Sequence, residues 1–236
     1  MENIKFTIVT VCYNSSQTIA NTIQSVLSQN YDNYEYWIID GASTDSTIEI
    51  LKSINNKHVK YITEPDKGIY DAMNKALNKA IGDYLLFLGA DDILFSSDTL
   101  KNIENKITDN TSIFYGNVIR TNTGAIYDGE FTKWDWGYKN ICHQAIFYPK
   151  SIYKNKKYNL EYKLVADWVY NLELLADSVN FRYINEVVSV YNDIDGLSST
   201  KVDEKFLKLR RKLIVNAVGI MPYIWGILNK ALNKVI

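Results

Sequence analysis

The chain has 236 residues, of which 47% are hydrophobic and 22% are charged, and its formal net charge at pH 7 is -1. This length allows one domain with a sizeable core, and the composition excludes a disordered or collagen-like chain. The balanced charge gives no sign of a nucleic-acid-binding protein, because such proteins carry an excess of basic residues.

The cysteines and the amino-terminal residues indicate the cellular compartment. Cys12 and Cys142 lie far apart and form no C-x-x-C motif, which predicts reduced, buried thiols. The first residues lead into a short β-type segment without the basic and long apolar regions of a signal peptide. Both features predict a cytoplasmic protein.

The first half of the chain alternates between segments typical of strands and segments with helical spacing. β-branched residues predict a buried strand at 5–11, followed by a helix that Ser15 or Ser16 would cap. The alternation continues with strands at 34–39, 59–63 and 84–88 and with helices at 43–54 and 69–81. This order predicts an α/β, Rossmann-like fold with a mainly parallel central sheet.

The pattern changes after residue 111. Two apolar segments, 113–120 and 125–131, flank a turn-like sequence and predict a β-hairpin. We expect one domain over residues 1–200, whose second half, 112–200, is smaller, mixed and less regular. Aromatic residues crowd this half; most would be core, although aromatic faces also suit stacking on a sugar or a nucleobase.

Residues 201–236 form a separate carboxyl-terminal segment in which basic residues precede an apolar stretch. Pro222 interrupts this stretch, which is too short to favour a membrane-spanning helix. Basic residues beside apolar ones, with Tyr223 and Trp225 among them, are typical of an amphipathic helix in a membrane interface. The alternative is a helix that packs on its own domain or on the second subunit of a homodimer.

Acidic residues follow three of the four predicted parallel strands. Asp40, Asp66 and the pair Asp91 and Asp92 stand just past strand ends, where ligands bind in open α/β sheets. Neighbouring carboxylates repel one another unless a cation lies between them. Mg²⁺ and Mn²⁺ prefer such oxygen ligands together with substrate phosphates. The pair therefore predicts a divalent-metal site.

Five motifs occur in order: TVCYN at 10–14, IDGASTD at 39–45, EPDKGIYDAMNKA at 64–76, GDYLLFLGADD at 82–92 and HQAIFY at 143–148. Together they resemble family 2 glycosyltransferases, which are inverting, use nucleotide sugars and have the GT-A fold. The sequence is particularly similar to bacterial enzymes of the colanic acid type, which build O-antigen, capsule or exopolysaccharide on a lipid carrier.

The resemblance implies a reaction and a place. A hexose or N-acetylhexosamine would pass from a nucleotide sugar, by default a UDP-sugar, to a hydroxyl of an undecaprenyl-diphosphate-linked saccharide. The enzyme would be peripherally associated with the cytoplasmic face of the inner membrane. Residues 1–111 would be the nucleotide-sugar-binding half and residues 112–200 the acceptor side.

The resemblance also implies which residues bind the donor. Val11, Tyr13 and Asn14 would line the base pocket, and Asp40 would contact the nucleobase or ribose. Asp66 would lie in the loop that closes the pocket, and Lys67 could supply a positive charge that the family often carries at the position of Met73. His143 and Gln144 border the donor site in similar enzymes and would reach the diphosphate or a sugar hydroxyl.

Two further roles follow from the same resemblance. Asp92 would be the firmer ligand of Mn²⁺ or Mg²⁺, and Asp91 would contact ribose or assist the metal. Asp167, at the start of a predicted helix, would be the catalytic base. A base must reach the acceptor hydroxyl on the face opposite the leaving group, and a helix start favours an ionised carboxylate.

Several positions depart from the family pattern. Gly41 and Gly89 stand where family members often have acidic or amide side chains, and Met73 and Glu173 stand where they often have Arg. A sugar-phosphate nucleotidyltransferase is one alternative, but it would need a glycine-rich, basic loop where this chain has CYNSSQT. A non-catalytic sugar-nucleotide-binding module is another, and the presence of Asp92 and Asp167 argues against it.

Overall fold

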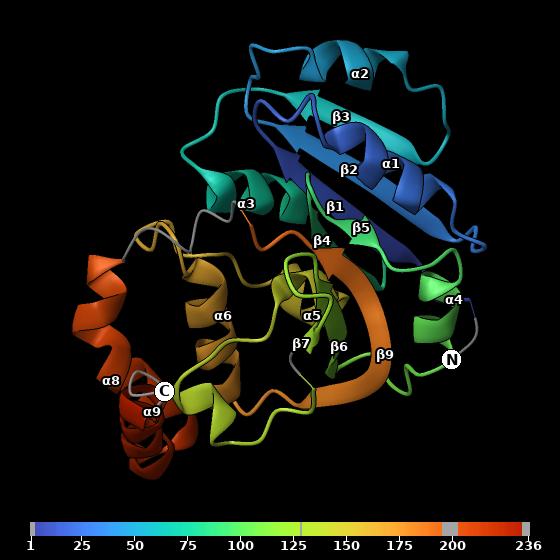
Figure 1. Ribbon diagram of the computed structural model, residues 1–236. Coiled ribbons are helices and arrows are strands. Elements are labelled where there is room, and N and C mark those ends of the chain that lie inside the picture. The colour runs from blue at the N-terminus through green and yellow to red at the C-terminus, as the bar shows by residue number, and fades with distance from the viewer. Residues whose placement is uncertain (1–2, 128, 195–202, 233–236) are drawn as a thin grey trace.

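The computed structural model describes residues 3–127, 129–194 and 203–232. The strands in these residues form one nine-stranded sheet in the order β3-β2-β1-β4-β8-β6-β9-β5, with β7 paired to β6 (Figure 1). They are β1 (Phe6–Cys12), β2 (Tyr34–Asp40), β3 (Val59–Thr63), β4 (Tyr84–Gly89), β5 (Ile93–Leu94), β6 (Ile113–Arg120), β7 (Ile126–Tyr127), β8 (Ile146–Pro149) and β9 (Phe181–Tyr191). The first four are parallel to one another, and β8 is antiparallel to β4 and β6.

Helices cover both faces of this sheet. They are α1 (Ile19–Leu27), α2 (Thr47–Ser53), α3 (Ile69–Lys79), α4 (Thr99–Glu104), α5 (Lys150–Tyr153), α6 (Ala166–Ala176), α8 (Glu204–Val218) and α9 (Ile220–Leu232), with short 3-10 helices η1 (Asp135–Gly137) and η2 (His143–Ala145). The structure confirms the expected α/β fold with a parallel first half, a mixed second half and a helical carboxyl-terminal region.

Strand β4 shows why the sheet has two cores. Leu85 and Phe87 face the core that contains α3 and α6, and Leu86 and Leu88 face the core that contains α1 and α4. Successive side chains of a strand point to opposite faces, so a strand buried on both faces is apolar throughout. Each such side chain contributes about 1.5–3 kcal/mol when buried. The strand therefore holds its carboxyl end, with Asp91 and Asp92 just beyond, in a fixed place.

Helix α2 begins four residues later than the expected start at residue 43. The backbone N–H groups of Ser43 and Thr44 donate to Asp40 and Asn14, and the N–H of Thr47 donates to Asp45. Side-chain acceptors thus take the N–H groups that an earlier helix start would leave without partners. Helix α1 likewise begins at Ile19, after the turn that Ser15 and Thr18 form.

The predicted hairpin is present but its second strand is short. Strands β6 and β7 pair antiparallel, with Ile119 opposite Ile126, and the turn contains Gly124 at φ 66. The expected strand over 125–131 ends at Tyr127, and residue 128 lies outside the described residues. Beyond it, the N–H of Phe131 donates to the hydroxyl of Tyr115 at 2.9 Å, so the backbone binds a side chain instead of the ladder.

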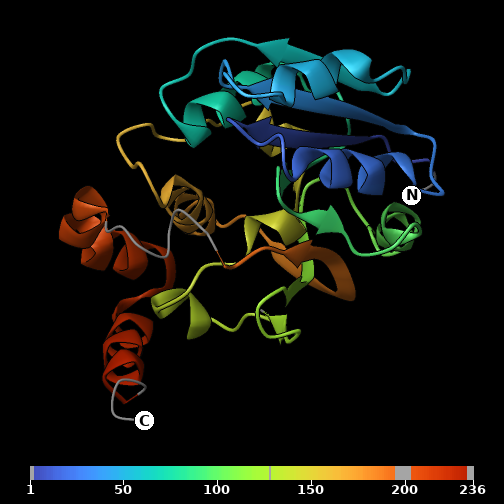
Figure 2. The ribbon, with the colours of Figure 1, turned by 45° about the horizontal axis from the view of Figure 1, so that its top comes forward.

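The carboxyl-terminal region forms two helices that pack on the domain. Helix α8 lies along α6, where Phe206 stacks near Trp168 with 4.8 Å between ring centroids. Gly219, at φ 90, separates α8 from α9, and Pro222 lies in the first turn of α9, where proline is tolerated. Figures 1 and 2 place both helices at the side of the molecule away from β1–β3. This packing corresponds to the second of the two expectations for this segment, a helix that packs on its own domain.

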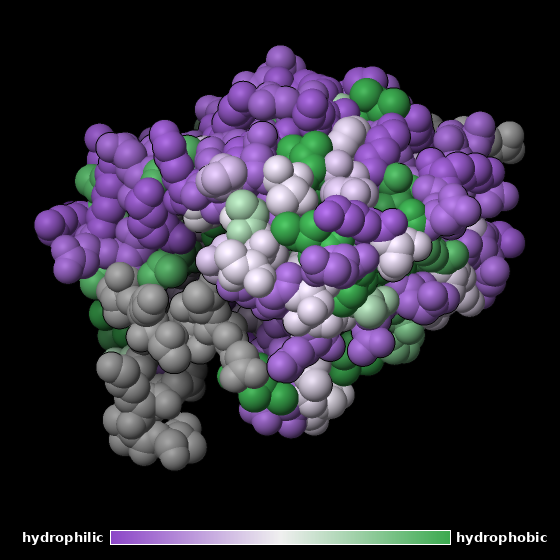
Figure 3. Space-filling view, turned by 90° about the horizontal axis from the view of Figure 1, so that it is seen from above, coloured by the Kyte–Doolittle hydropathy of each residue, from purple (hydrophilic) through white to green (hydrophobic). Residues whose placement is uncertain are grey.

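One face of α9 nevertheless stays exposed. Its apolar side chains, 43–62% exposed, are Ile220, Met221, Ile224, Trp225, Ile227 and Leu228. Hydrophilic residues predominate on the face shown in Figure 3, which looks down on α2 and β3. Among the described residues, no helix combines the length and the hydropathy needed to cross a membrane.

Gly226→Ala should loosen α9, because the two backbones touch at this position. A Cβ on Gly226 would lie 2.3 Å from the carbonyl oxygen of Gly137, so the helix must move. Overpacking costs about 1–3 kcal/mol, and about 1 kcal/mol shifts the Tm of a chain of this size by about 2–4 °C. Thermal unfolding should show a lower Tm for this variant than for Asn216→Ala on the exposed face of α8. Equal Tm values would show that α9 does not pack on η1.

Candidate active site

Two adjoining cavities lie at the carboxyl ends of the parallel strands. The first has a volume of about 690 Å³ and lies between the end of β1, the start of α3 and the end of β4. The second, of about 420 Å³, lies between the starts of α3 and α6 and the ends of β6 and β9. Both have the size of ligand sites. Their shared wall consists of Ile69, Gly89, Asp91, His143 and Asn192.

The first cavity contains most of the predicted donor residues. Val11, Tyr13, Asn14 and Asp66 line it together with Asp91 and His143 of the shared wall. The ring of Tyr13 is 61% exposed, which leaves its face free to stack on a flat ligand. Asn14 adopts φ 50, a conformation that Asn tolerates well, and its side chain accepts from Thr44 N–H at 2.8 Å.

Asp40 is absent from the described lining of both cavities, so its predicted contact with the nucleobase or ribose has no support in the geometry. It is fully buried, and it accepts hydrogen bonds from the backbone N–H and the hydroxyl of Ser43. Ser43 in turn accepts from the N–H of Asn14 at 2.7 Å. Burial, and then the nearby Asp40, raise the pKa of Cys12, which therefore remains a thiol. Asp40 thus holds the loop that carries Asn14.

Asp66 occupies the space that a side chain at position 41 would need. A Cβ on Gly41 would lie 2.5 Å from Asp66 Oδ2, and the other carboxylate oxygen accepts from Gly68 N–H at 2.8 Å. Asp66 therefore occupies the space that the acidic side chain found at position 41 in many family members would need. Lys67 is exposed and is absent from the described lining of both cavities, so its predicted role as a donor contact has no support in the geometry.

The structure gives the two adjacent acids different surroundings. Asp92 is 1% exposed and accepts three hydrogen bonds, from Asn192 N–H, Gly89 N–H and the Gln144 side chain, at 2.8–3.0 Å. Burial raises the pKa of Asp92 to about 6. Asp91 is exposed, lies in the shared wall and accepts one bond, from the Asn192 side chain at 3.0 Å.

Both acids line a cavity, Asp91 in the shared wall and Asp92 in the second cavity, and Asp91 is the more exposed of the two. Both oxygens of Asp92 already accept N–H groups, and Gln144, expected at the diphosphate, is one of the donors. Among the described residues, no cluster of three or more His, Cys, Asp or Glu could hold a metal ion. One exposed carboxylate fits Mg²⁺ or Mn²⁺, because such ions are often held by one or two carboxylates together with substrate phosphates.

Gly89 has a steric reason to lack a side chain. Its N–H donates to Asp92, and a Cβ there would lie 2.4 Å from Asp92 Oδ2. The acid or amide that the family often has at this position would displace Asp92. The glycine at position 89 therefore leaves the space that the buried Asp92 carboxylate occupies.

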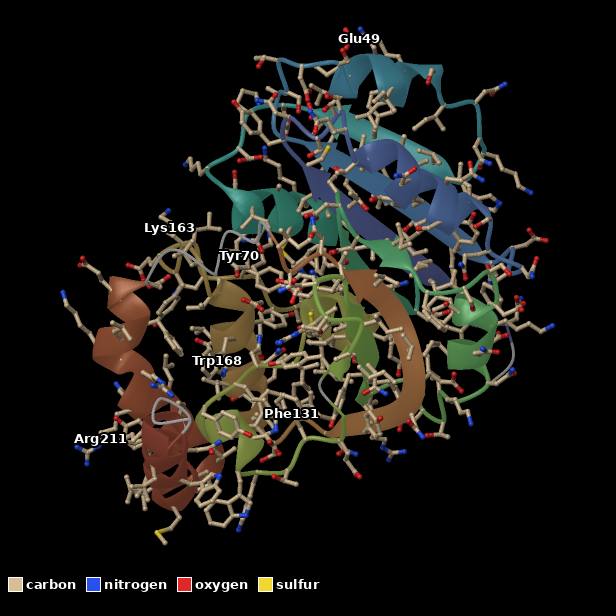
Figure 4. All side chains as sticks on the ribbon, viewed as in Figure 1. Glu49, Tyr70, Phe131, Lys163, Trp168 and Arg211 are labelled. Atoms are coloured by element: carbon tan, nitrogen blue, oxygen red, sulfur yellow. The ribbon has the colours of Figure 1, made fainter. Side chains whose placement is uncertain are left out.

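Asp167 lies in the first turn of α6 and lines the second cavity. Its Oδ1 accepts from the hydroxyl of Tyr70 at 2.6 Å, and His143 Nδ1 lies 3.9 Å from its Oδ2. Burial, and then the charge of Asp167, raise the pKa of Tyr70, which keeps this hydroxyl a donor. Burial lowers the pKa of His143, so its imidazole is neutral at pH 7. Figure 4 places Tyr70 where α3 meets α6.

A directed chain of side chains, which sequence reasoning missed, leads to the same carboxylate. Tyr148 donates to Asn171 at 2.9 Å, Asn171 donates to Asn140 at 3.0 Å, and Asn140 donates to Asp167 Oδ2 at 2.8 Å. Each amide uses its oxygen as acceptor and its nitrogen as donor. The chain therefore presents an N–H to Asp167 Oδ2, which holds the carboxylate in place. Each oxygen keeps a lone pair with which to accept a further proton.

The aromatic residues are mostly core, as expected. Trp136, Phe147, Tyr148, Tyr153, Tyr158, Tyr162 and Tyr170 are at most 4% exposed. Tyr127, Trp168 and Tyr191 instead line the second cavity. Aromatic side chains that expose one side to the cavity are suited to contact sugar rings.

Comparison with known proteins agrees with this geometry. The profile of the family described as Glycosyl transferase family 2 matches residues 7–177. The chain belongs to glycosyltransferase family 2. Because members of this family transfer sugars, membership argues against the nucleotidyltransferase alternative.

Relatives and solved structures extend the comparison. A PGL/p-HBAD biosynthesis glycosyltransferase of Mycobacterium tuberculosis is 35% identical over 86% of this chain and 82% of its own length. The Escherichia coli UDP-Glc:alpha-D-GlcNAc-diphosphoundecaprenol beta-1,3-glucosyltransferase WfaP is 28% identical over 92% and 87%. The crystal structure of S. aureus TarS 1-349 in complex with UDP-GlcNAc superposes with a TM-score of 0.75 at 20% identity, covering 98% of this chain and 72% of that chain. It supports the fold.

Proposed function

We propose that the protein is an inverting, metal-dependent hexosyltransferase that acts on a lipid-linked saccharide in the synthesis of a bacterial surface polysaccharide. The observation that carries this proposal is the pair of cavities with a shared wall. Asp91 stands in that wall, and Asp167 faces the second cavity. A transferase that joins two substrates directly needs such neighbouring sites.

The substrates are inferred from the relatives. The name of WfaP states a UDP-glucose donor and a GlcNAc-diphosphoundecaprenol acceptor, and TarS was solved with UDP-GlcNAc. We assign a UDP-sugar to the first cavity, where Tyr13 would stack on the base. The lipid-linked saccharide is assigned to the second cavity, beside Trp168 and Tyr191.

The chemistry follows from the placement of Asp167. Its carboxylate takes the proton of an acceptor hydroxyl, whose oxygen forms a bond to the anomeric carbon of the donor. The bond from that carbon to the diphosphate oxygen breaks on the opposite face, so the configuration inverts and UDP leaves. Tyr70 and Asn140 hold the carboxylate in place throughout. Mn²⁺ or Mg²⁺ held by Asp91 would supply positive charge to the leaving diphosphate.

A panel of UDP-, GDP- and dTDP-sugars tests the proposal. The purified protein, with Mn²⁺ or Mg²⁺ and a synthetic GlcNAc-diphospho-lipid, should transfer one sugar from a UDP donor to form a β-linked product if the donor is α-linked. The anomeric configuration is read by NMR. Formation of a nucleotide sugar from a sugar phosphate and a nucleoside triphosphate, without transfer to the acceptor, would contradict the proposal.

We also propose that α9 lies on the membrane that carries the acceptor. Its exposed apolar face is accompanied by the exposed basic residues Lys208, Arg211 and Lys212 of α8, and Arg211 points away from the body of the domain in Figure 4. Trp134 of the domain lies 6.3 Å from Trp225, centroid to centroid, and is also exposed. Apolar area and positive charge together bind anionic lipid.

Co-sedimentation with vesicles that contain phosphatidylglycerol tests the membrane proposal. Trp225→Ser combined with Ile224→Ser should reduce the bound fraction severalfold, because both side chains lie in the exposed face. Ile81→Ser is a matched control, since Ile81 is 49% exposed but lies at the end of α3. Equal binding by both variants would show that α9 is not the contact.

A further inference from the structure

We propose that Arg120 forms a subsite for a phosphate group of the acceptor within the second cavity. This inference rests on the proposed function, because it concerns the acceptor of that reaction. Arg120 stands at the end of β6 and lines the second cavity but not the first. It is therefore placed to meet the acceptor rather than the nucleotide.

One face of the Arg120 guanidinium group stacks on an aromatic ring, and this contact holds the group in place. Its central carbon lies 3.7 Å from the centroid of the Tyr127 ring, across the β6–β7 hairpin. Its Nε lies 3.9 Å from Asp193 Oδ2, which is an ion pair but not a hydrogen bond. That nitrogen is buried and has no hydrogen-bond partner among the described residues. The stacked face orients the group and leaves its N–H edges to bind a ligand.

Among the described residues, Arg120 has an ion pair with Asp193, but no hydrogen bond joins the two side chains. Asp193 is only a distant partner, and its other oxygen accepts from the N–H of Asn122 at 2.9 Å. Lys163 lines the same cavity with an exposed side chain, whereas Lys139 is paired with Asp135 at 3.6 Å. Figure 4 shows Lys163 above the start of α6. Arg120 and Lys163 thus place two cationic side chains in a cavity that Asp91, Asp92 and Asp167 also line.

A phosphate is the anion that fits this arrangement and the proposed acceptor. A planar guanidinium binds phosphate through two parallel hydrogen bonds, and stacking on an aromatic ring reduces the cost of ordering it. In the proposed acceptor, a diphosphate joins the saccharide to its lipid. The saccharide would then lie between this diphosphate at Arg120 and the reacting hydroxyl at Asp167. A carboxylate of an acidic sugar has similar chemistry, and the experiment separates the two.

The test compares three acceptors that carry the same sugar: an alkyl diphosphate, a neutral alkyl glycoside, and an alkyl glycoside with an added uronic acid. Arg120→Gln should raise KM for the diphosphate acceptor by about 10- to 100-fold, as expected for loss of a charge-assisted contact. KM for the neutral glycoside and for donor hydrolysis should stay unchanged. Arg120→Lys should recover part of the affinity, and Lys57→Gln, at an exposed site away from the cavities, serves as control.

Each other outcome overturns the assignment. An equal loss with the neutral glycoside would mean that Arg120 has a structural role, and a rise in KM for donor hydrolysis would place it at the donor. A loss confined to the uronic acid acceptor would assign a carboxylate instead of a phosphate. If wild-type protein transfers no sugar, the proposed function fails, but calorimetry with the diphosphate acceptor still decides whether Arg120 binds it.

Discussion

Asp167→Asn should lower sugar transfer by about 10²- to 10⁴-fold, which is the usual contribution of a positioned general base. Asn has the shape of Asp but cannot take the proton of the acceptor hydroxyl. Donor affinity should stay within about twofold, because Asp167 lines only the second cavity. Turnover and donor binding are measured separately, the first with saturating acceptor and the second by calorimetry with UDP.

Asn140→Ala separates orientation of the base from its presence. This variant keeps Asp167 but removes the N–H that Asn140 donates to it. We expect kcat to fall by about 10-fold or more, since hydrogen bonds to charged groups contribute about 1.5–3 kcal/mol. Asn155→Ala, at an exposed site, should leave kcat unchanged. An unchanged kcat in Asn140→Ala would show that Asn140 does not orient the base.

Asp91→Asn should lower kcat/KM by at least about 100-fold, since metal stabilisation of a leaving group is worth several kcal/mol. Excess chelator should abolish transfer by the wild-type protein, and Mn²⁺ or Mg²⁺ should restore it. Asp92→Asn should act differently, because Asp92 is buried and both of its oxygens accept N–H groups of the protein. Replacing one carboxylate oxygen by an NH₂ group places two donors against each other.

Thermal unfolding distinguishes the two acids. Loss of a buried hydrogen bond costs about 1–3 kcal/mol, so Asp92→Asn should lower Tm by about 2–12 °C, while Asp91→Asn should leave Tm nearly unchanged. The folded state holds the Asp92 proton up to about pH 6, whereas an unfolded chain releases it near 3.8. The contribution of Asp92 to stability therefore falls as pH rises between these values. Transfer that persists in chelator, or a Tm loss in Asp91→Asn alone, would contradict this division.

The parallel half of the fold could be predicted because its signal is local. β4 is apolar throughout and α3 has apolar residues on one side, so periodicity alone locates both. The predicted start of α2 was wrong because side chains, and not backbone carbonyls, accept the N–H groups in this segment, as Asp40 does from Ser43. The sequence also could not show that the apolar tail splits at Gly219, since a glycine inside an apolar segment does not reveal which surface each part will meet.

The site was harder to predict than the fold. Position after a strand end indicates that an acid lies near the cavities, but not whether it points into them or beneath the loop. Asp40 is buried and absent from the described lining of both cavities, Asp92 is buried but lines the second cavity, and Asp66 and Asp91 line the first. Asn140 and Asn171 carry no local signal, because their importance comes from contacts between segments about thirty residues apart. Arg120 also carries no local signal, because its contact with the Tyr127 ring forms only when β6 and β7 pair.

The short segment of residues 66–70 has a consequence for how this enzyme can be altered. Asp66 and Gly68 line the first cavity, and two residues further on the hydroxyl of Tyr70 donates to Asp167. A substitution here that changes sugar preference will therefore disturb proton removal as well, and selection for a new donor would meet a loss of rate. Residues 13–18 line the other wall of the same cavity, and no described hydrogen bond joins them to Asp167. Directed evolution of donor preference should find its useful changes there.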